Sequence, residues 1–308
     1  MLTSSYKDWL LMKRIALLQK IVKQIGVPVE HLSVQGATIK GRRIKTSYLS
    51  AGAGKPILLL HGGDAGAGSI RWYPVIGPLS TCFRVIVPDM LGYGESDKPF
   101  ASYDRSFFSA WLKNYLDTLG LKKVSLVGHS VGGAIASQFT LDHPEYIEQL
   151  VLVNAAGLGE GTQRIPARIK VRMIWQNLFP SCAASRWFLE HYGLFNARMI
   201  NETMLDIEEY GCEVIRMSGG RRVFWLGRGR VIDPIPLERL GQITQPTLLV
   251  WGEEDINFPP AIARLAMKMM KDTQLCLIPR AGHNCFYDQP DMFNDILKRF
   301  LMEDNSRV

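Results

Sequence analysis

A serine flanked by small residues is the side chain in this sequence best suited to act as a nucleophile. Ser130 stands in the segment Gly128-His129-Ser130-Val131-Gly132-Gly133, between the apolar run 124–127 and the helix-forming stretch 134–139. A serine at such a sharp strand-to-helix turn presents its hydroxyl above the sheet, and the turn requires small neighbours. The alternative is a glycine-rich turn that carries an incidental serine. We predict a nucleophile elbow at Ser130.

A serine hydroxyl needs a base to remove its proton, and histidine commonly supplies it. The sequence has six histidines, and His283 follows the last apolar run, 274–278, in a loop. This loop should lie at the same sheet edge as Ser130, so we predict that His283 is the general base. We expect structural roles for the other five, with one of them shaping the glycine turn near residue 62: His31, His61, His129, His143 and His191.

A carboxylate should follow another strand and hold the histidine in the correct tautomer. The strand predicted at 247–250 is followed by three acids: Glu253, Glu254 and Asp255. We favour Asp255 by its position. Asp89 at another strand end is the rival, but its loop favours a bracing role. The predicted catalytic residues therefore occur in the chain order Ser130, Asp255, His283.

The negative oxygen of a tetrahedral intermediate needs hydrogen-bond donors. A glycine pair, Gly62-Gly63, ends one apolar strand, and Val131 begins the helix after the elbow. We predict that the backbone amides of Gly63 and Val131 form the oxyanion hole. A phosphate-binding loop is the alternative, but segment 62–69 lacks a Gly-Lys-Ser/Thr ending and contains a carboxylate.

Short apolar runs alternate with helical stretches along most of the chain and predict the elements that position these residues. Runs that are apolar on both sides indicate a mostly parallel sheet with helices on both faces, an α/β fold. The carboxyl ends of its strands then form one edge where ligands bind. Three β-prone pieces in 29–49 predict an antiparallel meander at the sheet edge. The apolar runs are 56–60, 84–87, 124–127, 150–153, 247–250 and 274–278.

A long interval interrupts this alternation and is rich in aromatic residues. It is too long for a single connection, so we predict a helical cap over the active site at 158–233, with helices at 168–179 and 197–209. The alternative is a plain packing module. The α/β core would then comprise 27–157 and 234–308.

The first 26 residues predict an amphipathic helix. Packing on the protein's own core, a dimer contact and contact with an anionic membrane are the three alternatives, and we favour packing. The expected apolar face comprises Leu11, Ile15, Leu18, Val22 and Ile25. The expected flanks carry Lys13, Arg14, Lys20 and Lys23.

Composition excludes several function classes. The 308 residues carry a net charge of +7, but the basic residues are dispersed and form no aromatic-interleaved tract, so we expect no nucleic-acid partner. The five cysteines form no C-x-x-C pair, and we expect no metal or other cofactor. Their odd number and the absence of a signal peptide favour the cytoplasm. No apolar run is long enough to span a bilayer.

The elbow 128–133 and the pair Gly282-His283 resemble the α/β-hydrolase superfamily from about residue 45 to 301. Serine at the elbow argues against the branches that carry aspartate there. The His-Gly-Gly and Gly-His-Ser-x-Gly-Gly patterns resemble carboxylesterases and lipases. Segments 66–69, 87–97 and 154–159 resemble the meta-cleavage-product hydrolases, which split carbon–carbon bonds. Those enzymes usually have asparagine in place of His129 and tryptophan in place of Asn284, and their cap arginine has no assignable counterpart here.

These observations predict a serine hydrolase that acts on a carboxylic ester of a small apolar molecule. The first alternative is a carbon–carbon bond hydrolase of the meta-cleavage-product type. The second is a ligand sensor that retains the three catalytic residues, as some hormone receptors on this fold do.

Overall fold

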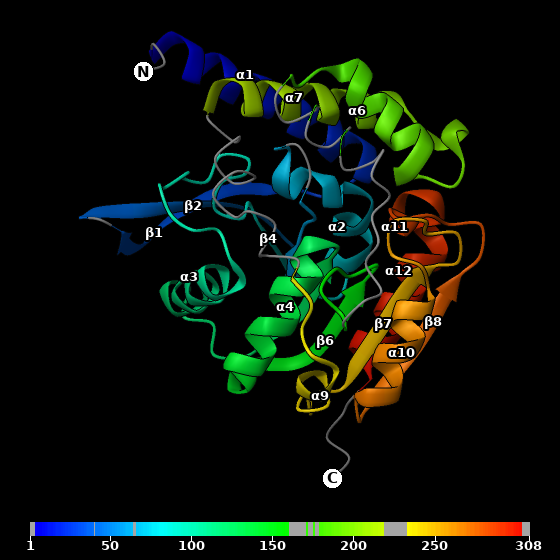
Figure 1. Ribbon diagram of the computed structural model, residues 1–308. Coiled ribbons are helices and arrows are strands. Elements are labelled where there is room, and N and C mark those ends of the chain that lie inside the picture. The colour runs from blue at the N-terminus through cyan, green and yellow to red at the C-terminus, as the bar shows by residue number, and fades with distance from the viewer. Residues whose placement is uncertain are drawn as a thin grey trace.

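In the part of the chain that the structure describes, eight strands form one sheet in the order β1-β2-β4-β3-β5-β6-β7-β8 (Figure 1). The computed structural model describes residues 4–39, 41–63, 66–159, 171, 175, 179–218 and 233–303. The strands are β1 (Glu30–Ile39), β2 (Arg42–Ala51), β3 (Pro56–Leu60), β4 (Arg84–Pro88), β5 (Val124–His129), β6 (Ile147–Val153), β7 (Thr247–Gly252) and β8 (Thr273–Ile278).

The strands from β4 to β8 in this order are parallel to one another. They coincide with the six apolar runs, and every residue of β5 and β7 is buried. Strands that are apolar on both sides must be covered on both faces, so the predicted α/β class with a mostly parallel sheet is confirmed. The carboxyl ends of β3, β5, β7 and β8 carry the candidate site residues.

The edge of the sheet is a two-stranded hairpin. Strand β1 pairs antiparallel with β2, and β2 pairs antiparallel with β4. The predicted meander is therefore correct in direction, but its first two pieces belong to one strand. A register shift between Gln35 and Thr38 separates those two pieces.

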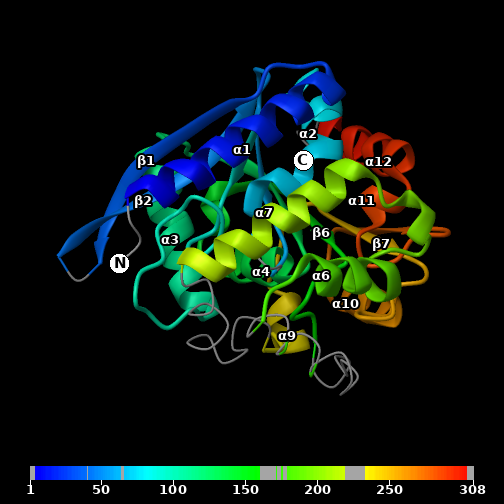
Figure 2. The ribbon, with the colours of Figure 1, turned by 90° about the horizontal axis from the view of Figure 1, so that it is seen from above.

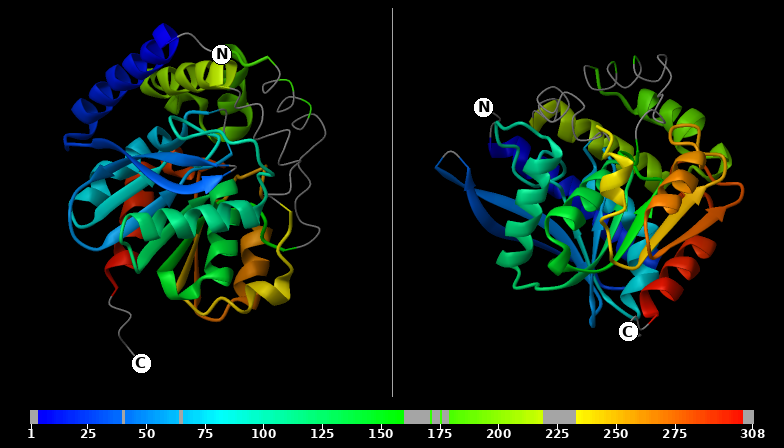
Figure 3. Two further views of the ribbon diagram at one scale, coloured as in Figure 1. Left: turned by 90° about the vertical axis from the view of Figure 1, so that its left-hand side faces the viewer. Right: turned by 60° about the horizontal axis from the view of Figure 1, so that its bottom comes forward.

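Helices cover both faces of the sheet (Figures 1 and 3). One face packs against α2 (Tyr73–Ser80), α11 (Cys285–Asp288) and α12 (Pro290–Met302). The other packs against α3 (Arg105–Thr118), α4 (Val131–Asp142), α9 (Leu237–Leu240) and α10 (Ala261–Met269). Alternate residues of each central strand enter one apolar cluster or the other, which fixes the strands between the two layers. Short helical turns are η1 (Gly68–Trp72) and η2 (Pro144–Tyr146).

The chain between β6 and β7 forms the insertion that contains α6 (Cys182–Phe188), η3 (Leu189–Gly193), η4 (Ala197–Met199) and α7 (Glu202–Ser218). The helix predicted at 197–209 is interrupted. Asn201 accepts a hydrogen bond from the Met204 amide, and a separate helix, α7, begins at the residue after Asn201. The helix predicted at 168–179 lies largely outside the described residues. Leu158 and Ile235 form an isolated bridge where the insertion leaves and rejoins the core.

The N-terminal helix α1 (Ser4–Ile25) lies along α7 and packs on α2 (Figure 2). Its predicted apolar face is wrong in part, because Leu11 and Ile15 are 40% and 39% exposed whereas Arg14 is 0% exposed. The buried stripe comprises Leu10, Arg14, Leu17, Leu18 and Ile21. Arg14 can be buried because a carboxylate from a distant segment pairs with it.

Among the helices that the structure describes, we find none with the length and apolar content required to cross a membrane.

Candidate active site

Ser130 occupies a strained turn between β5 and α4. Its φ of 52° lies in the left-handed region that side chains other than glycine rarely adopt. The neighbouring backbone is packed closely: a Cβ on Gly128 would lie 2.4 Å from the Gly132 carbonyl oxygen, and one on Gly132 would lie 2.5 Å from the Leu60 carbonyl oxygen. The glycines are therefore required for the turn, and the turn places the Ser130 hydroxyl at the carboxyl edge of the sheet.

The three side chains predicted to act together are joined by hydrogen bonds. His283, in the loop after β8, has Nε2 3.0 Å from Ser130 Oγ. On the other side of the ring, Nδ1 lies 2.9 Å from Oδ2 of Asp255, which follows β7. All three residues are buried. This is the geometry in which an imidazole can accept a hydroxyl proton and a carboxylate can orient the imidazole.

The Asp255 carboxylate is held by three further donors. Asn154 Nδ2 donates to Oδ2 at 2.7 Å, while the Asn257 and Phe258 amides donate to Oδ1 at 2.8 and 3.0 Å. These hydrogen bonds stabilise the charged acid and fix its direction toward His283. Reasoning from residue types missed Asn154, whose φ of 42° is a conformation that asparagine tolerates better than most residues. Its signal in the sequence was an asparagine directly after a strand.

The rival acids have other partners. Glu254 accepts hydrogen bonds from the Arg280 and Ala281 amides and so braces the loop that carries His283. Glu253 is exposed. Asp89 forms an ion pair with Arg14, which places it in the bracing role that we expected.

His129, next to the nucleophile, points away from it and supports His283. Its Nε2 lies 3.0 Å from the His283 carbonyl oxygen, and its ring packs edge-on against Phe286. Burial, with a smaller contribution from the nearby His283, lowers the pKa of His129 well below its ordinary value. A neutral His129 therefore donates from Nε2 to the backbone of His283.

The backbone of Gly62 and Gly63 lies against the elbow. A Cβ on Gly63 would be 2.6 Å from Val131 Cγ2, and one on Gly62 would be 3.3 Å from Ser130 Cβ. Val131 is the first residue of α4, so its amide has no acceptor within the helix. The backbone of Gly63 therefore lies against the first residue of α4, beside Ser130.

His61 shapes this glycine turn. Its Nε2 accepts a hydrogen bond from the Met90 amide at 3.1 Å, so Nδ1 carries the proton and donates to the Gly62 carbonyl at 2.7 Å. The remaining histidines lie outside the site: His31 bonds to Ser47, His143 caps α4 and His191 bonds to the Trp187 carbonyl.

A segment of the insertion, residues 192–196, is bonded to the loops that carry Asp255 and His283. Asn257 Nδ2 donates to the Tyr192 carbonyl at 2.8 Å, and the Asn284 backbone amide donates to the Gly193 carbonyl at 2.8 Å. The Asp288 carboxylate accepts from the amides of Phe195, Asn196 and Gly282. The insertion is therefore connected to the loops that carry Asp255 and His283.

The described residues contain no group of three or more His, Cys, Asp or Glu side chains placed to hold a metal ion.

Comparison with known proteins supports one assignment of fold and family. Residues 57–296 match the family model described as the alpha/beta hydrolase family. The 2-hydroxy-6-oxo-6-phenylhexa-2,4-dienoate hydrolase of Burkholderia cepacia is 31% identical over 259 residues, which cover 82% of this chain and 89% of that protein.

Two solved structures show the same fold. A meta-cleavage product hydrolase from Pseudomonas fluorescens has a TM-score of 0.76 at 24% identity, over 89% of this chain and 98% of that chain. Naproxen esterase from Bacillus subtilis has a TM-score of 0.78 at 19% identity, over 98% of this chain and 99% of that chain. Proteins with different reactions therefore share this architecture.

Proposed function

The chain belongs to the α/β-hydrolase family, and on this premise we propose that it is a serine hydrolase that cleaves carboxylic esters of small apolar molecules. The observation that carries the proposal is the continuous chain of hydrogen bonds from Ser130 through His283 to Asp255. The glycine turn against Val131 supports it, because it supplies amides beside the nucleophile.

In the proposed reaction, His283 removes the proton from Ser130 Oγ as this oxygen attacks the ester carbonyl carbon. The amides of Gly63 and Val131 bind the negative oxygen of the tetrahedral intermediate. The intermediate collapses, the alcohol leaves with the proton from His283, and an acyl-serine remains. Water, deprotonated by His283, then attacks the acyl-serine, the bond from the acyl carbon to Ser130 Oγ breaks, and His283 returns the proton to Oγ as the carboxylic acid is released. Asp255 orients the imidazole and stabilises its protonated form throughout.

The charges near the elbow support an uncharged ester as substrate. Arg71 directly precedes Trp72, whose ring packs edge-on against His129. The Arg71 guanidinium forms an ion pair with Glu208, whose side chain is 6% exposed. The charge of this arginine is therefore balanced within the protein, and a substrate carboxylate would compete with Glu208.

The test of the proposed function is hydrolysis of p-nitrophenyl butyrate. We expect multiple turnovers by the wild type, and a loss of at least about a thousandfold in kcat for Ser130→Ala, because removal of the nucleophile leaves only binding and the oxyanion hole. Ser106→Ala, at an exposed serine of α3, serves as the matched control and should retain activity. A fluorophosphonate should label Ser130, as identified by mass spectrometry of its peptide.

The same experiment separates the alternatives. Carbon–carbon hydrolysis is the second candidate, because the relative from Burkholderia cepacia, at 31% identity, is named as a hydrolase of 2-hydroxy-6-oxo-6-phenylhexa-2,4-dienoate. Cleavage of 2-hydroxy-6-oxo-6-phenylhexa-2,4-dienoate with a higher kcat/KM than any ester would favour it. A single acylation without further turnover would instead favour a ligand sensor. Full activity of Ser130→Ala would contradict all three.

A further inference from the structure

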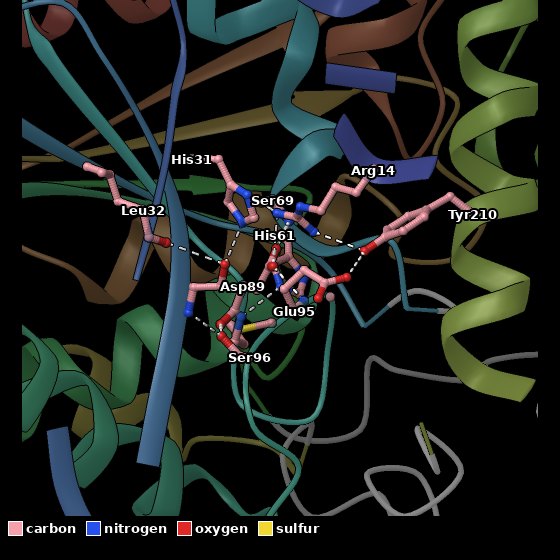
Figure 4. Close-up of polar contacts among 12 residues, drawn as sticks. Arg14, His31, Leu32, His61, Ser69, Asp89, Glu95, Ser96 and Tyr210 are labelled. Carbon is pink, nitrogen blue, oxygen red and sulfur yellow. Dashed lines mark hydrogen bonds and ion pairs between the residues drawn. The ribbon is translucent and has the colours of Figure 1, made fainter. Parts of the chain in front are cut away.

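A buried ion pair connects the N-terminal helix to the end of β4. Nη2 of Arg14 lies 3.0 Å from Asp89 Oδ2, and both side chains are 0% exposed. The same guanidinium reaches Ser69 Oγ at 3.0 Å and the hydroxyl of Tyr210 at 3.3 Å, and Tyr210 donates in turn to Glu95 (Figure 4). Arg14 thus joins α1, β4, η1 and α7.

Both members of the pair are charged. Burial alone would lower the pKa of Arg14, but Asp89, Tyr210 and Glu95 raise it above its ordinary value. Burial alone would raise the pKa of Asp89, but Arg14 and the hydrogen bonds from Ser69 and Glu95 hold it below its ordinary value. A buried charge requires a partner, so the position of each group depends on the other.

Asp89 holds the far end of the glycine turn. The Ser69 amide donates to its Oδ1 at 2.7 Å, and the Glu95 amide donates to its Oδ2 at 2.8 Å. The next residue, Met90, donates its amide to His61, which binds the Gly62 carbonyl. Both sides of the turn that carries Gly63 are therefore held by the end of β4.

Helix α7 closes over the same turn. A Cβ on Gly66 would lie 2.9 Å from the Gly211 carbonyl oxygen of α7, one residue beyond Tyr210. The contact from Arg14 to Tyr210 therefore fixes α7 against the backbone at Gly66.

We propose that Arg14 is a positioning residue for ester hydrolysis. Through Asp89 and Ser69 it fixes the loop that presents the Gly63 amide, and through Tyr210 it fixes α7 on that loop. The inference rests on the proposed function, because it assigns Gly63 to the oxyanion hole. Helix α1 precedes residues 57–296, which match the family model. The support that Arg14 gives to the Gly63 loop therefore comes from outside the matched segment.

The test compares Arg14→Met, Arg14→Lys and Tyr210→Phe with Lys13→Ala, a control on the same helix that loses an exposed ion pair to Glu209. We measure kcat and KM for p-nitrophenyl butyrate, and the rate of Ser130 labelling by a fluorophosphonate, at a temperature where each variant is folded. For Arg14→Met we expect kcat and the labelling rate to fall by between about tenfold and a hundredfold, with a smaller change in KM. For Arg14→Lys we expect a smaller fall in kcat and labelling rate than for Arg14→Met, because lysine keeps the positive charge but lacks the several N–H donors of the guanidinium. Lys13→Ala should stay within about twofold of the wild type.

A second measurement is independent of turnover. Amide hydrogen exchange, followed by mass spectrometry of peptides from 66–72 and 202–218, should be faster in Arg14→Met than in Lys13→Ala. Unchanged exchange in both segments together with unchanged kcat would overturn the proposal. If Arg14→Met does not fold, Arg14→Lys and Tyr210→Phe decide by the same criteria. Failure of the proposed function would instead appear in the wild type, as absent ester turnover and absent labelling, and exchange would still report whether Arg14 holds these segments.

Discussion

At the scale of single residues, the chemistry of the site depends on backbone conformations that few side chains tolerate. Ser130 at φ 52° and Asn154 at φ 42° both stand directly after a parallel strand. Ser130 places its hydroxyl beside His283, and Asn154 places its amide beside the Asp255 carboxylate. Such strain persists because the surrounding packing over-determines it, and it lies where orientation has chemical value.

His129 gives the fold a dependence on pH. Its pKa is lowered well below the ordinary 6.5, chiefly by burial. Below pH 6.5 the unfolded chain binds a proton at His129 that the folded chain does not. The free energy of unfolding must therefore decrease as pH falls below 6.5, by up to about 1.4 kcal/mol per pH unit for this one group. Above pH 6.5 the group is neutral in both states and adds no slope.

The measurement is urea unfolding at several pH values between 5 and 8 for wild type and His129→Gln. The glutamine side-chain amide is long enough to donate to the His283 carbonyl in place of His129 Nε2, but it does not titrate in this range. We expect a shallower decline below pH 6.5 in the variant. His31, whose pKa is also lowered by burial, is present in both proteins and cancels in the difference. Parallel stability curves would refute the assignment to His129.

At the scale of elements, the insertion segment 192–196 supports the loop that carries His283, and the Asp288 side chain joins the two in addition to the backbone bond between Asn284 and Gly193. Its carboxylate is pinned by the amides of Phe195, Asn196 and Gly282. For Asp288→Ala, which leaves these buried donors without an acceptor, we expect kcat for an ester to fall by about tenfold or more, since a hydrogen bond to a charged group contributes about 1.5–3 kcal/mol.

Asp291→Ala, at the exposed start of α12, is the matched control and should leave kcat unchanged. The measurement is kcat of both variants from steady-state kinetics at one pH, and circular dichroism establishes that both variants are folded. Equal kcat in the two variants would show that the Asp288 link between the insertion and the His283 loop has no part in hydrolysis.

The strands of the sheet could be predicted because their pattern is local. The apolar run of β5, which precedes Ser130, is buried along its whole length, and the run of β8, which precedes His283, lies in an edge strand that is mostly half-buried. The interruption before α7 and the role of Asn154 could not be predicted in this way. Both depend on a particular side-chain hydrogen bond, from Met204 to Asn201 or from Asn154 to Asp255, and the latter joins residues far apart in the sequence.

At the scale of the whole molecule, helix α1 shows where reasoning from periodicity fails. An arginine beside an apolar stripe is expected on the solvated flank of a helix, and Leu11 and Ile15 are expected inside. The structure reverses these positions, because Asp89 and Tyr210 supply Arg14 with partners from two other segments. Burial of a charge is decided by what lies opposite it in the fold, and the sequence of the helix holds no information about that.

The Arg14–Asp89 pair should therefore dominate the attachment of the N-terminal helix. Arg14→Met leaves the Asp89 carboxylate buried without its cation, and we expect a loss of about 3–5 kcal/mol in the free energy of unfolding at pH 7. Lys13→Ala, which breaks the exposed pair with Glu209, should cause a much smaller loss that disappears at high salt. In Arg14→Met/Asp89→Asn the uncompensated charge is gone, so the double variant should be more stable than the sum of the two single losses predicts. Urea unfolding of the wild type, the single variants Arg14→Met, Asp89→Asn and Lys13→Ala, and the double variant at low and high salt measures these differences. Additive losses, or equal losses for Arg14→Met and Lys13→Ala, would mean that apolar packing rather than the buried pair holds α1 in place.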